Sequence, residues 1–379
     1  MKRYCESYIY QDLTKKMVLI GGPRQVGKTT LSKNLCHNQF ANYLYLNWDN
    51  DEDRRMILKK TWTADTKLII FDELHKYPRW KSWIKGVYDT KPLQQEYLVT
   101  GSARLDVYKK GGDSLMGRYH YWRLHPLTID ELPPTISKEE GFQRLISLGG
   151  FPEPFLSHDL REARRWRRER FDRIIREDIR DLESIRNLQI LSLFVDALRE
   201  RVGSIVTLAN MAEDLQISPK TAKHWLEIVE KMYLAFPIYP LVKNIPRAIQ
   251  KPPKVFFYDN GDVIGDFGAK LENFVATTLL KRLHFLEDYY GHRASLHYIR
   301  DKDGREVDFV TKVNNDIIDL IEVKATNTDI SSALKYYSRK LNPKNTVQLV
   351  ANLKRAHQQD NILVTNPIEY FSNPPWEEK

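Results

Sequence analysis

The sequence contains only two cysteines, Cys5 and Cys36, and their spacing matches no metal-binding or disulfide pattern. This scarcity predicts a reducing compartment and a fold without structural disulfides. No stretch approaches the roughly 18 apolar residues that a membrane-spanning helix needs. The N-terminal segment MKRYCESYIYQDLTKK has no apolar signal core. Together these absences predict a cytoplasmic protein with no membrane partner.

Internal repeats and low-complexity tails are also absent, and the composition is that of a globular protein. Of the 379 residues, 42% are hydrophobic and 29% are charged. A chain of this length is too long for one ordinary core and predicts two or three domains. Lys and Arg number 59 against 50 Asp and Glu, which gives a net charge of +9. This excess favours a polyanionic partner, and we expect nucleic acid, with DNA favoured over RNA.

The order of apolar runs predicts an α/β fold in the first third of the chain. Within 17–130, helical stretches separate four strand-like runs, MVLIGG, YLYLNW, KLIIFDEL and EYLVTGSA. This alternation is typical of a parallel sheet flanked by helices. From 131 to about 200 the chain is helical and strongly charged, with nine arginines in 161–180.

The region that follows is similar to a winged helix-turn-helix. Residues 203–240 predict a helix, a turn at Ile217-Ser218-Pro219 and a second helix capped by Ser218. A proline-rich break, NIPRAIQKPPK, then precedes a last α/β unit that begins at the strand VFFYD. We therefore predict three domains, at 1–135, 136–250 and 251–379.

A glycine-rich segment, MVLIGGPRQVGKTTL, predicts a nucleotide site. It places a strand before Gly22-x-x-x-x-Gly27-Lys28-Thr29 and a helix after it, with Thr30 beside the motif. Glycines let backbone N–H groups point at phosphate oxygens, Lys28 reaches the β and γ phosphates, and the Thr29 hydroxyl binds Mg²⁺. The sequence therefore predicts ATP and Mg²⁺ as ligands.

Three later segments supply candidate partners for that loop. Asp72 and Glu73 end a buried strand, where Asp72 would hold Mg²⁺ through water and Glu73 would polarise the attacking water. Ser102 follows another strand and would either sense the γ-phosphate or cap the strand end. Arg118 would neutralise transition-state charge, in cis or towards a neighbouring subunit, or would form a surface salt bridge.

A charged hairpin is predicted in EVDFVTKVNNDIIDLIEVKAT, residues 306–326. If Asn314-Asn315-Asp316 forms the turn, Asp308 lies opposite Glu322 and Lys324 shares their face. Like charges directly opposite each other destabilise a sheet. A metal ion or an ammonium between them removes the repulsion, so the residues predict a metal site or a cross-strand ion-pair cluster. Glu272, in a predicted helix, offers a third acid.

These motifs resemble a widespread prokaryotic family of AAA-type ATPases, related to the clade of origin-recognition and STAND ATPases. The resemblance rests on the following runs: GGPRQVGKTTL, IIFDELHKYPRWKSWIKGVYD, TGSARLDVY, SLMGRYHYWRLHPLTIDEL, GGFPEPF and VFFYDNGDVIGDFGAKLENFVATTLL. It implies an ATPase domain, a winged helix and a nuclease-like C-terminal domain of unknown function. AAA-type sites often complete each other across an interface, which is compatible with a homo-oligomer.

The acids of the last domain are similar to the PD-(D/E)xK nuclease core in their order along the chain. In that pattern Asp308 and Glu322 bind Mg²⁺ or Mn²⁺, Glu272 supports the metal or its water, and Lys324 orients the water or offsets phosphate charge. The implied reaction is metal-assisted phosphodiester hydrolysis. Many members of that superfamily keep the fold without the activity, so the ion-pair cluster remains the alternative.

Two functions from different classes fit these features. In the first, the protein hydrolyses ATP, acts on nucleic acid and couples its nucleotide state to the nuclease-like domain. In the second, it is a STAND-like switch whose last domain only binds a partner. Nucleic-acid contacts would come from the arginines of 161–180, unless they pair with interleaved acids, and from three residues that begin the second helix of the winged-helix region: Lys220, Lys223 and His224.

Overall fold

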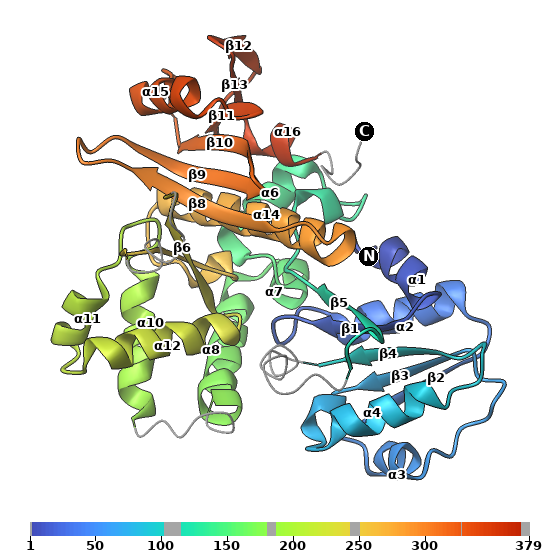
Figure 1. Ribbon diagram of the computed structural model, residues 1–379. Helices are drawn as coiled ribbons and strands as arrows, with labels where there is room; N and C mark the ends of the chain where they lie inside the picture. Colours follow the sequence, from blue (N-terminus) through green and yellow to red (C-terminus); the bar gives the residue numbers. More distant parts are fainter. Residues whose placement is uncertain (1, 102–114, 180–186, 243–250, 327, 373–379) are drawn as a thin grey trace. The chain divides into compact units, whose positions relative to one another are not determined.

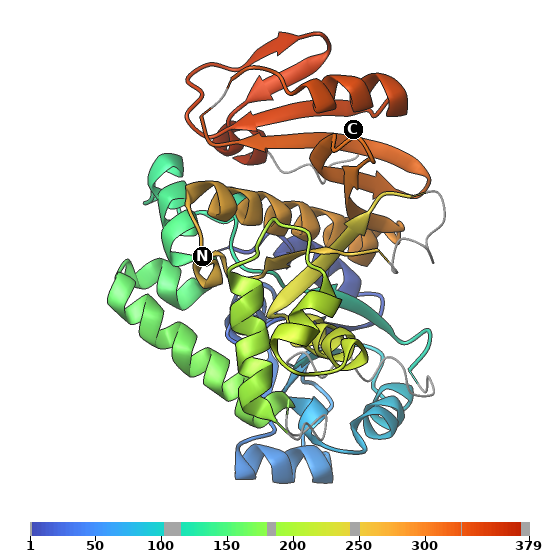
Figure 2. The same ribbon diagram turned by 90° about the vertical axis from the view of Figure 1, so that its left-hand side faces the viewer.

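The computed structural model describes all residues except 1, 102–114, 180–186, 243–250, 327 and 373–379, and the side chain of 38. It divides into two compact units, Met1–His125 and Pro126–Lys379, which are drawn from two sides in Figure 1 and Figure 2. Within the described part of the chain, no helix is long and apolar enough to cross a membrane.

The first unit alternates strands and helices, as the sequence predicts. Its strands are β1 (Met17–Gly21), β2 (Tyr43–Asn47), β3 (Leu68–Asp72), β4 (Glu96–Thr100) and β5 (Tyr119–Arg123). Its helices are α1 (Glu6–Leu13), α2 (Lys28–Gln39), α3 (Asp51–Lys59), the short η1 (Leu74–Lys76) and α4 (Trp80–Asp89).

All strands of this unit are parallel and lie in the order β2-β3-β4-β1-β5. The predicted parallel sheet is therefore confirmed, and β5 adds a strand that no predicted run included. Because β4 lies between β1 and β3, the ends of these three strands meet at one edge. That edge carries the glycine-rich loop after Gly21, the acid Asp72 and the hydroxyl of Thr100.

Helices cover both faces of this sheet. On one face α3 and α4 bury Ile57, Trp80 and Ile84 against alternate strand residues such as Leu19 and Phe71. On the other face lie α1 and α2, as Figure 1 shows. A parallel strand buried on both faces must be apolar along its whole length, which explains why β1 and β3 read as continuous apolar runs.

The second unit begins with helices and turns. They are η3 (Ile129–Glu131), α6 (Lys138–Leu148), α7 (Pro152–Ser157), α8 (Leu160–Arg173), the π-helical η4 (Ile174–Ile179), α10 (Leu188–Arg199), α11 (Leu208–Asp214) and α12 (Pro219–Lys231). The Ser218 cap is confirmed, since its hydroxyl accepts a 3.0 Å hydrogen bond from the N–H of Thr221. Trp225 and Leu226 are buried, as expected for core residues.

An eight-stranded mixed sheet forms the rest of this unit, in the order β12-β13-β11-β10-β9-β8-β6-β7. The strands are β6 (Ala235–Pro240), β7 (Lys254–Phe257), β8 (Ala294–Arg300), β9 (Glu306–Val313), β10 (Asp316–Lys324), β11 (Asn345–Val350), β12 (His357–Gln359) and β13 (Ile362–Thr365). The remaining helices are η5 (Asn260–Asp262), α14 (Phe267–Tyr290), α15 (Ser332–Leu341) and α16 (Pro367–Ser372).

This sheet crosses the boundary predicted at 250. Strand β6 precedes the boundary and β7 follows it, yet the two pair antiparallel, and β6 also pairs with β8. The two strands that follow α12 therefore belong to the large sheet. Helix α14 contacts β7, β8, β9 and β10, and α15 contacts β9 and β10.

The predicted hairpin is β9 and β10, with one correction to its turn. Asp316 pairs with Val313, so the turn is Asn314-Asn315, and Asn314 takes the positive φ (56°) common in tight hairpins. A bulge between Ile317 and Asp319 adds one residue to β10. Beyond it the pairs follow the predicted register, and continuing that register places Asp308 opposite Glu322.

Candidate functional site

The glycine-rich loop lies between β1 and α2, and two of its glycines are required by geometry. Gly27 precedes α2 with φ of 96°, and Gly22 has φ of 132°. A Cβ on Gly22 would lie 2.4 Å from the carbonyl oxygen of Leu124. Only glycine fits there without strain, and the loop can therefore curve with its backbone close to a bound group.

Lys28 is buried at the start of α2, with 7% of its surface exposed. Its ammonium donates to the carbonyl oxygens of Gly22 (3.1 Å) and Pro23 (2.7 Å). Arg3 fastens the same loop from the N-terminal segment by donating to the carbonyl oxygen of Val26 at 3.0 Å. The loop thus holds a cation at its centre, as a phosphate site requires.

Asp72, at the end of β3, gathers hydroxyl groups from three other elements. It accepts hydrogen bonds from Thr29 of α2 (2.8 Å), Tyr45 of β2 (2.5 Å) and Thr100 of β4. The structure thus brings together the predicted Thr29 and Asp72. Tyr45 and Thr100 were missed by sequence reasoning; the signal for Thr100 was its place at the end of the run EYLVT.

Glu73 follows Asp72 in a left-handed conformation, with φ of 57°. Burial raises the pKa of its carboxyl group, whereas the charges of Lys28 and Lys76 lower it. Lys76 lies 3.5 Å from its carboxylate, and the ring of His75 lies 3.7 Å away. Thr30 is exposed on α2, and Ser102 lies outside the described residues.

The structure argues against the cis role considered for Arg118. This residue immediately precedes β5, and Tyr119 pairs with Met17 at the start of β1, so Arg118 lies at the sheet edge opposite the glycine-rich loop. Its guanidinium makes a bidentate ion pair with Asp89 at 2.6 and 3.1 Å. Within one chain the length of β1 separates the two sites, because both strands run in the same direction.

A second charged site lies at the β9–β10 hairpin and centres on a lysine that the sequence reasoning missed. Lys254 of β7 is 2% exposed, and its ammonium lies 2.6 Å from Glu306, 3.3 Å from Glu272 and 3.6 Å from Asp308. Lys324 contacts Glu322 at 2.7 Å. An ammonium therefore accompanies each of the opposed carboxylates. The only signal for Lys254 was a lysine at the start of an apolar run.

The acids of this cluster differ from ordinary surface carboxylates. Burial, assisted by the charge of Asp308, raises the pKa of Glu272 to about 8 and that of Glu322 to about 7. Gly203 packs closely against Glu272, since a Cβ at this glycine would lie 2.5 Å from Oε2 of that side chain. Oε2 of Glu322 is buried and has no hydrogen-bond partner among the described residues.

Metal-binding geometry is not present in this cluster as it stands. Within the described ranges, no three or more His, Cys, Asp or Glu side chains are arranged to hold a metal ion. Asp308 accepts a hydrogen bond from the N–H of Val323 at 2.9 Å, which occupies one of its oxygens. The predicted acids Glu272, Asp308 and Glu322 are thus brought together, with lysines among them.

Comparison with protein families divides the chain into three parts. Residues 14–133 match the AAA domain family, 139–263 match a domain of unknown function (DUF8612), and 267–371 match another (DUF4143). Residues 14–133 are therefore similar to an AAA domain. The match coincides with the parallel sheet, the glycine-rich loop and the acidic strand end described above.

Curated relatives are distant. The chain is 24% identical to the uncharacterized protein Rv2008c of Mycobacterium tuberculosis over 65% of this chain and 54% of the relative. It therefore spans about half the length of that mycobacterial relative. It is also 24% identical to the uncharacterized protein MJ1544 of Methanocaldococcus jannaschii, over 86% of this chain and 79% of the relative.

Two solved structures were also compared with the chain. The Holliday junction branch migration motor RuvB of Thermotoga maritima aligns with a TM-score of 0.31 at 15% identity, over 65% of this chain and 92% of that one. A Pif1 helicase on forked DNA aligns with a TM-score of 0.23 at 13% identity, over 39% and 52%. At these TM-scores the superpositions carry no argument about function.

Proposed function

We propose that the protein binds and hydrolyses ATP at the glycine-rich loop of its first unit. The observation that carries this proposal is the hydrogen bond between Thr29 and Asp72, which joins the start of the phosphate-binding helix to the acidic strand end. A P-loop NTPase uses these two groups together, around one divalent cation. Lys28, buried against the loop carbonyls, supplies the charge for the phosphates.

Each side chain has a defined task in this proposal. Thr29 and Asp72 would hold Mg²⁺, which neutralises phosphate charge when it is bound with ATP. Lys28 exchanges its loop carbonyl partners for phosphate oxygens. Glu73 orients the attacking water, and the raised pKa of its carboxyl group makes it a stronger base than an exposed glutamate. Thr100 fixes Asp72 from the neighbouring strand.

The test is ATP turnover in Lys28→Ala, with Lys59→Ala as the matched control. Both changes remove one lysine charge from a helix of the first unit, but Lys59 is exposed at the end of α3. We expect Lys28→Ala to abolish turnover and Lys59→Ala to leave it unchanged. Equal turnover in the two variants would sink the ATPase proposal.

For the second unit we propose a metal-dependent, nuclease-like activity at the cluster of Glu272, Asp308, Glu322 and Lys324, acting on nucleic acid. The unpartnered Oε2 of Glu322 and the raised pKa values of Glu272 and Glu322 support it, because a divalent cation relieves both features. Such activity requires the ammonium of Lys254 to give way to the cation or to share the carboxylates with it.

A direct test is cleavage of single- and double-stranded DNA and of RNA, with Mg²⁺ or Mn²⁺ and with or without ATP. Lys324→Ala should lose cleavage, whereas Lys344→Ala, an exposed lysine that precedes β11, should retain it. Cleavage that depends on ATP in the wild type and disappears in Lys28→Ala would show coupling between the nucleotide site and the cluster. DNA cleavage above RNA cleavage would support the predicted preference.

The lysines of the cluster favour a second candidate function. Lys254 and Lys324 already pair with the acids, so the C-terminal domain of a STAND-like switch could bind a partner without any chemistry. In that case ATP would be retained with negligible turnover, and no metal would cause cleavage. ATP turnover stimulated by DNA or RNA would instead support the enzyme that acts on nucleic acid. Light scattering in the presence of ATP would reveal a homo-oligomer.

A further inference from the structure

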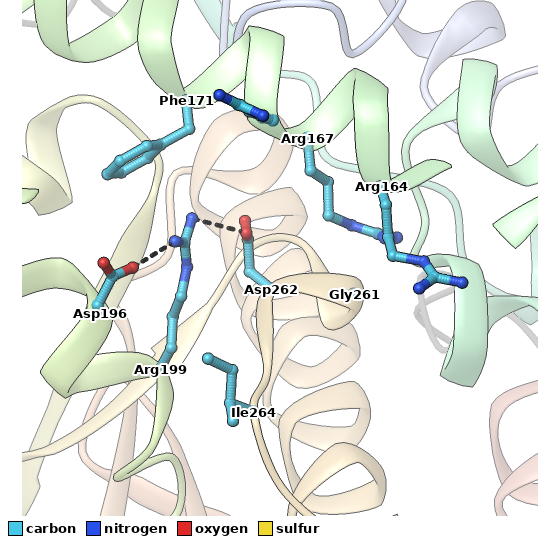
Figure 3. A pocket seen from close by; sticks show the side chains of 9 residues that line it. Arg164, Arg167, Phe171, Asp196, Arg199, Gly261, Asp262 and Ile264 are labelled. Atoms are coloured by element: carbon cyan, nitrogen blue, oxygen red, sulfur yellow. Dashed lines mark hydrogen bonds and ion pairs between the residues drawn. The ribbon is translucent and has the colours of Figure 1, made fainter. Parts of the chain in front are cut away.

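Helices α8 and α10 meet the turn after β7 around a cavity of about 340 Å³, here called the arginine pocket. Figure 3 shows the side chains that line it. Four arginines line it, together with two aspartates, one aromatic and one aliphatic side chain: Arg164, Arg167, Arg168, Arg199, Asp196, Asp262, Phe171 and Ile264, with Gly261 completing the wall. The pocket lies entirely within the second unit and shares no residue with the clusters described above.

Arg167 packs closely against Gly261 at the floor of the pocket. Arg167 donates to Asp259 at 2.8 Å and also to the carbonyl oxygen of Leu148. Its guanidinium lies against the backbone of Gly261, where a Cβ would come within 1.8 Å of it. Asp259 in turn accepts from the N–H of Gly261 at 3.1 Å. These contacts hold Arg167 in one orientation.

Arg199 is fixed in the same way on the opposite side. Its two terminal nitrogens donate to Asp196 (2.7 Å) and Asp262 (2.9 Å), as Figure 3 shows. Its guanidinium also lies over the ring of Phe171, 4.5 Å from the centroid. Beneath it, the buried Arg170 lies 3.8 Å from Asp262. Because these contacts hold the planar guanidinium of Arg199 in place, it does not need to reorient when an anion binds.

The rim carries charge that the pocket does not balance. Arg164 donates from Nε to the carbonyl oxygen of Leu160. Within the described ranges neither Arg164 nor Arg168 has a carboxylate at ion-pairing distance, although both are exposed. Five arginines, Arg170 included, face the three aspartates Asp196, Asp259 and Asp262. The pocket and its floor therefore carry a net charge of +2.

Other arginines of α8 show that this arrangement is local. Arg161 and Arg165 are spaced as Arg164 and Arg168 are, but both pair with Glu162, at 3.0 and 3.3 Å. Two arginines four residues apart repel each other on a helix unless an anion lies between them. In the part of the chain that the structure describes, Arg164 and Arg168 have no carboxylate paired between them in this way.

We propose that the arginine pocket binds a phosphate group of a nucleotide or of a nucleic-acid strand. A phosphate carries up to two negative charges, matching the excess in the pocket, and its oxygens accept the paired donors of guanidinium groups. Ile264, 55% exposed at the wall, offers an apolar surface to the sugar or base attached to the phosphate. This site is separate from the glycine-rich loop and does not depend on the ATPase proposal.

The experiment measures binding by the full chain in a Lys28→Ala background, so that the glycine-rich loop contributes little. The test variant is Arg164→Ala/Arg168→Ala, and the matched control is Arg161→Ala/Arg165→Ala. Both remove two charges from exposed positions of the same helix, and circular dichroism checks that both fold. The probes are a fluorescein-labelled single-stranded oligonucleotide, AMP and inorganic phosphate, at fixed salt concentration.

We expect the test variant to weaken binding of at least one phosphate-bearing probe about tenfold or more, and the control to weaken it less than about threefold. Loss confined to the oligonucleotide identifies a phosphodiester strand as the source, whereas loss of AMP binding identifies a free nucleotide. Equal losses in both variants, or binding that neither variant changes, would overturn the proposal. None of these results depends on whether the chain turns over ATP, so failure here is distinguishable from failure of the proposed ATPase.

Discussion

The hydroxyl of Thr29 and the carboxylate of Asp72 are joined by a 2.8 Å hydrogen bond across 43 residues of sequence. This bond links the first turn of α2 to the end of β3. Thr100 donates to the other oxygen of the same carboxylate from β4, which lies between β1 and β3. Together with Tyr45 of β2, these groups from α2 and β4 set the orientation of Asp72.

Asp72→Asn should separate nucleotide binding from hydrolysis. The amide keeps an oxygen that can accept from Thr29, but it loses the charge that attracts Mg²⁺. We expect turnover to fall about 100-fold or more, a loss of about 2.7 kcal/mol of transition-state stabilisation, while ATP affinity without Mg²⁺ stays within a few-fold. Steady-state turnover and a fluorescent-nucleotide titration measure the two quantities. Unchanged turnover would exclude Asp72 from the Mg²⁺ site.

Thr100→Val also acts on the carboxylate of Asp72, but it removes a hydrogen bond and leaves the charge. Removing the hydroxyl leaves Asp72 with one buried bond fewer, which costs about 1 to 2 kcal/mol in the free energy of unfolding. Turnover should fall less than in Asp72→Asn, because the charge remains. Thr90→Val is the control, since that hydroxyl donates only to Gly86 on the surface of α4. If Thr100→Val were as inactive as Asp72→Asn, Thr100 would have a direct part in catalysis.

Stability should fall as the pH rises from about 4.5 to 8 because of Glu272. Its pKa is raised from 4.5 to about 8 in the folded chain, so the folded state holds a proton that the unfolded state has released. Glu322 adds a similar contribution up to about pH 7. Glu272→Gln, neutral throughout, should flatten the decline, whose slope is at most about 1.4 kcal/mol per pH unit for one proton. Urea unfolding between pH 5 and 8.5 measures it.

Added Mg²⁺ or Mn²⁺ should raise the urea midpoint at pH 8 if the acids bind a cation, since a ligand that binds only the folded state stabilises it. Glu322→Gln should lose this increase, whereas Asp316→Asn, in the exposed turn region of the same hairpin, should retain it. An ion-pair cluster would give no metal dependence in any of the three proteins, and Glu322→Gln would then change stability alone.

Arg118→Ala should leave nucleotide binding by the single chain unchanged, because Arg118 lies at the sheet edge opposite the glycine-rich loop. Its ion pair with Asp89 is screened by solvent and should contribute little to stability. If Arg118 acts on a neighbouring subunit, turnover falls in the variant and partly returns when Arg118→Ala is mixed with Lys28→Ala. Normal turnover of Arg118→Ala would show that the ion pair is its whole role.

The buried pair of Lys281 and Glu131 should be costly to break. Both side chains are only 1% exposed, and Thr128 also accepts from the ammonium, at 2.5 Å. Lys281→Met removes this ammonium from the buried carboxylate of Glu131 and should lower the free energy of unfolding by about 3 to 5 kcal/mol. Lys281→Met/Glu131→Leu should recover most of that loss, as equilibrium unfolding in urea would show. Similar losses in both variants would mean that packing, and not charge, dominates at this position.

Several features of the sites could be predicted because neighbouring residues determine them. The glycine-rich loop needs Gly22 and Gly27 for its positive φ angles, and the strand before it and the helix after it follow from local pattern. The β9–β10 register was predicted from the polar break at Asn314-Asn315-Asp316, even though the turn is one residue shorter than expected. The bulge between Ile317 and Asp319 compensates for that difference, so the face shared by Asp308 and Glu322 was still correct.

Other features depend on contacts that no local pattern encodes. Lys254 reaches the acidic cluster because β7 joins the same sheet as β9 through β6 and β8. Arg118 was a candidate to neutralise charge at the nucleotide site of its own chain. Because β5 runs parallel to β1, Arg118 lies at the sheet edge opposite the glycine-rich loop. The sequence around Arg118 does not reveal the direction of β5.

The sequence by itself determined the glycine-rich loop, the acid that ends β3 and the charged hairpin, since each lies within a few consecutive residues with fixed backbone geometry. Only the tertiary structure decided which partners these groups have: Thr100 beside Asp72, Lys254 among the carboxylates, and Asp259 and Asp262 among the arginines of α8 and α10. The physical reason is that a charge or a hydroxyl group acts over a few ångströms in space. Which residues come within that distance is set by strand order and helix packing across the whole unit.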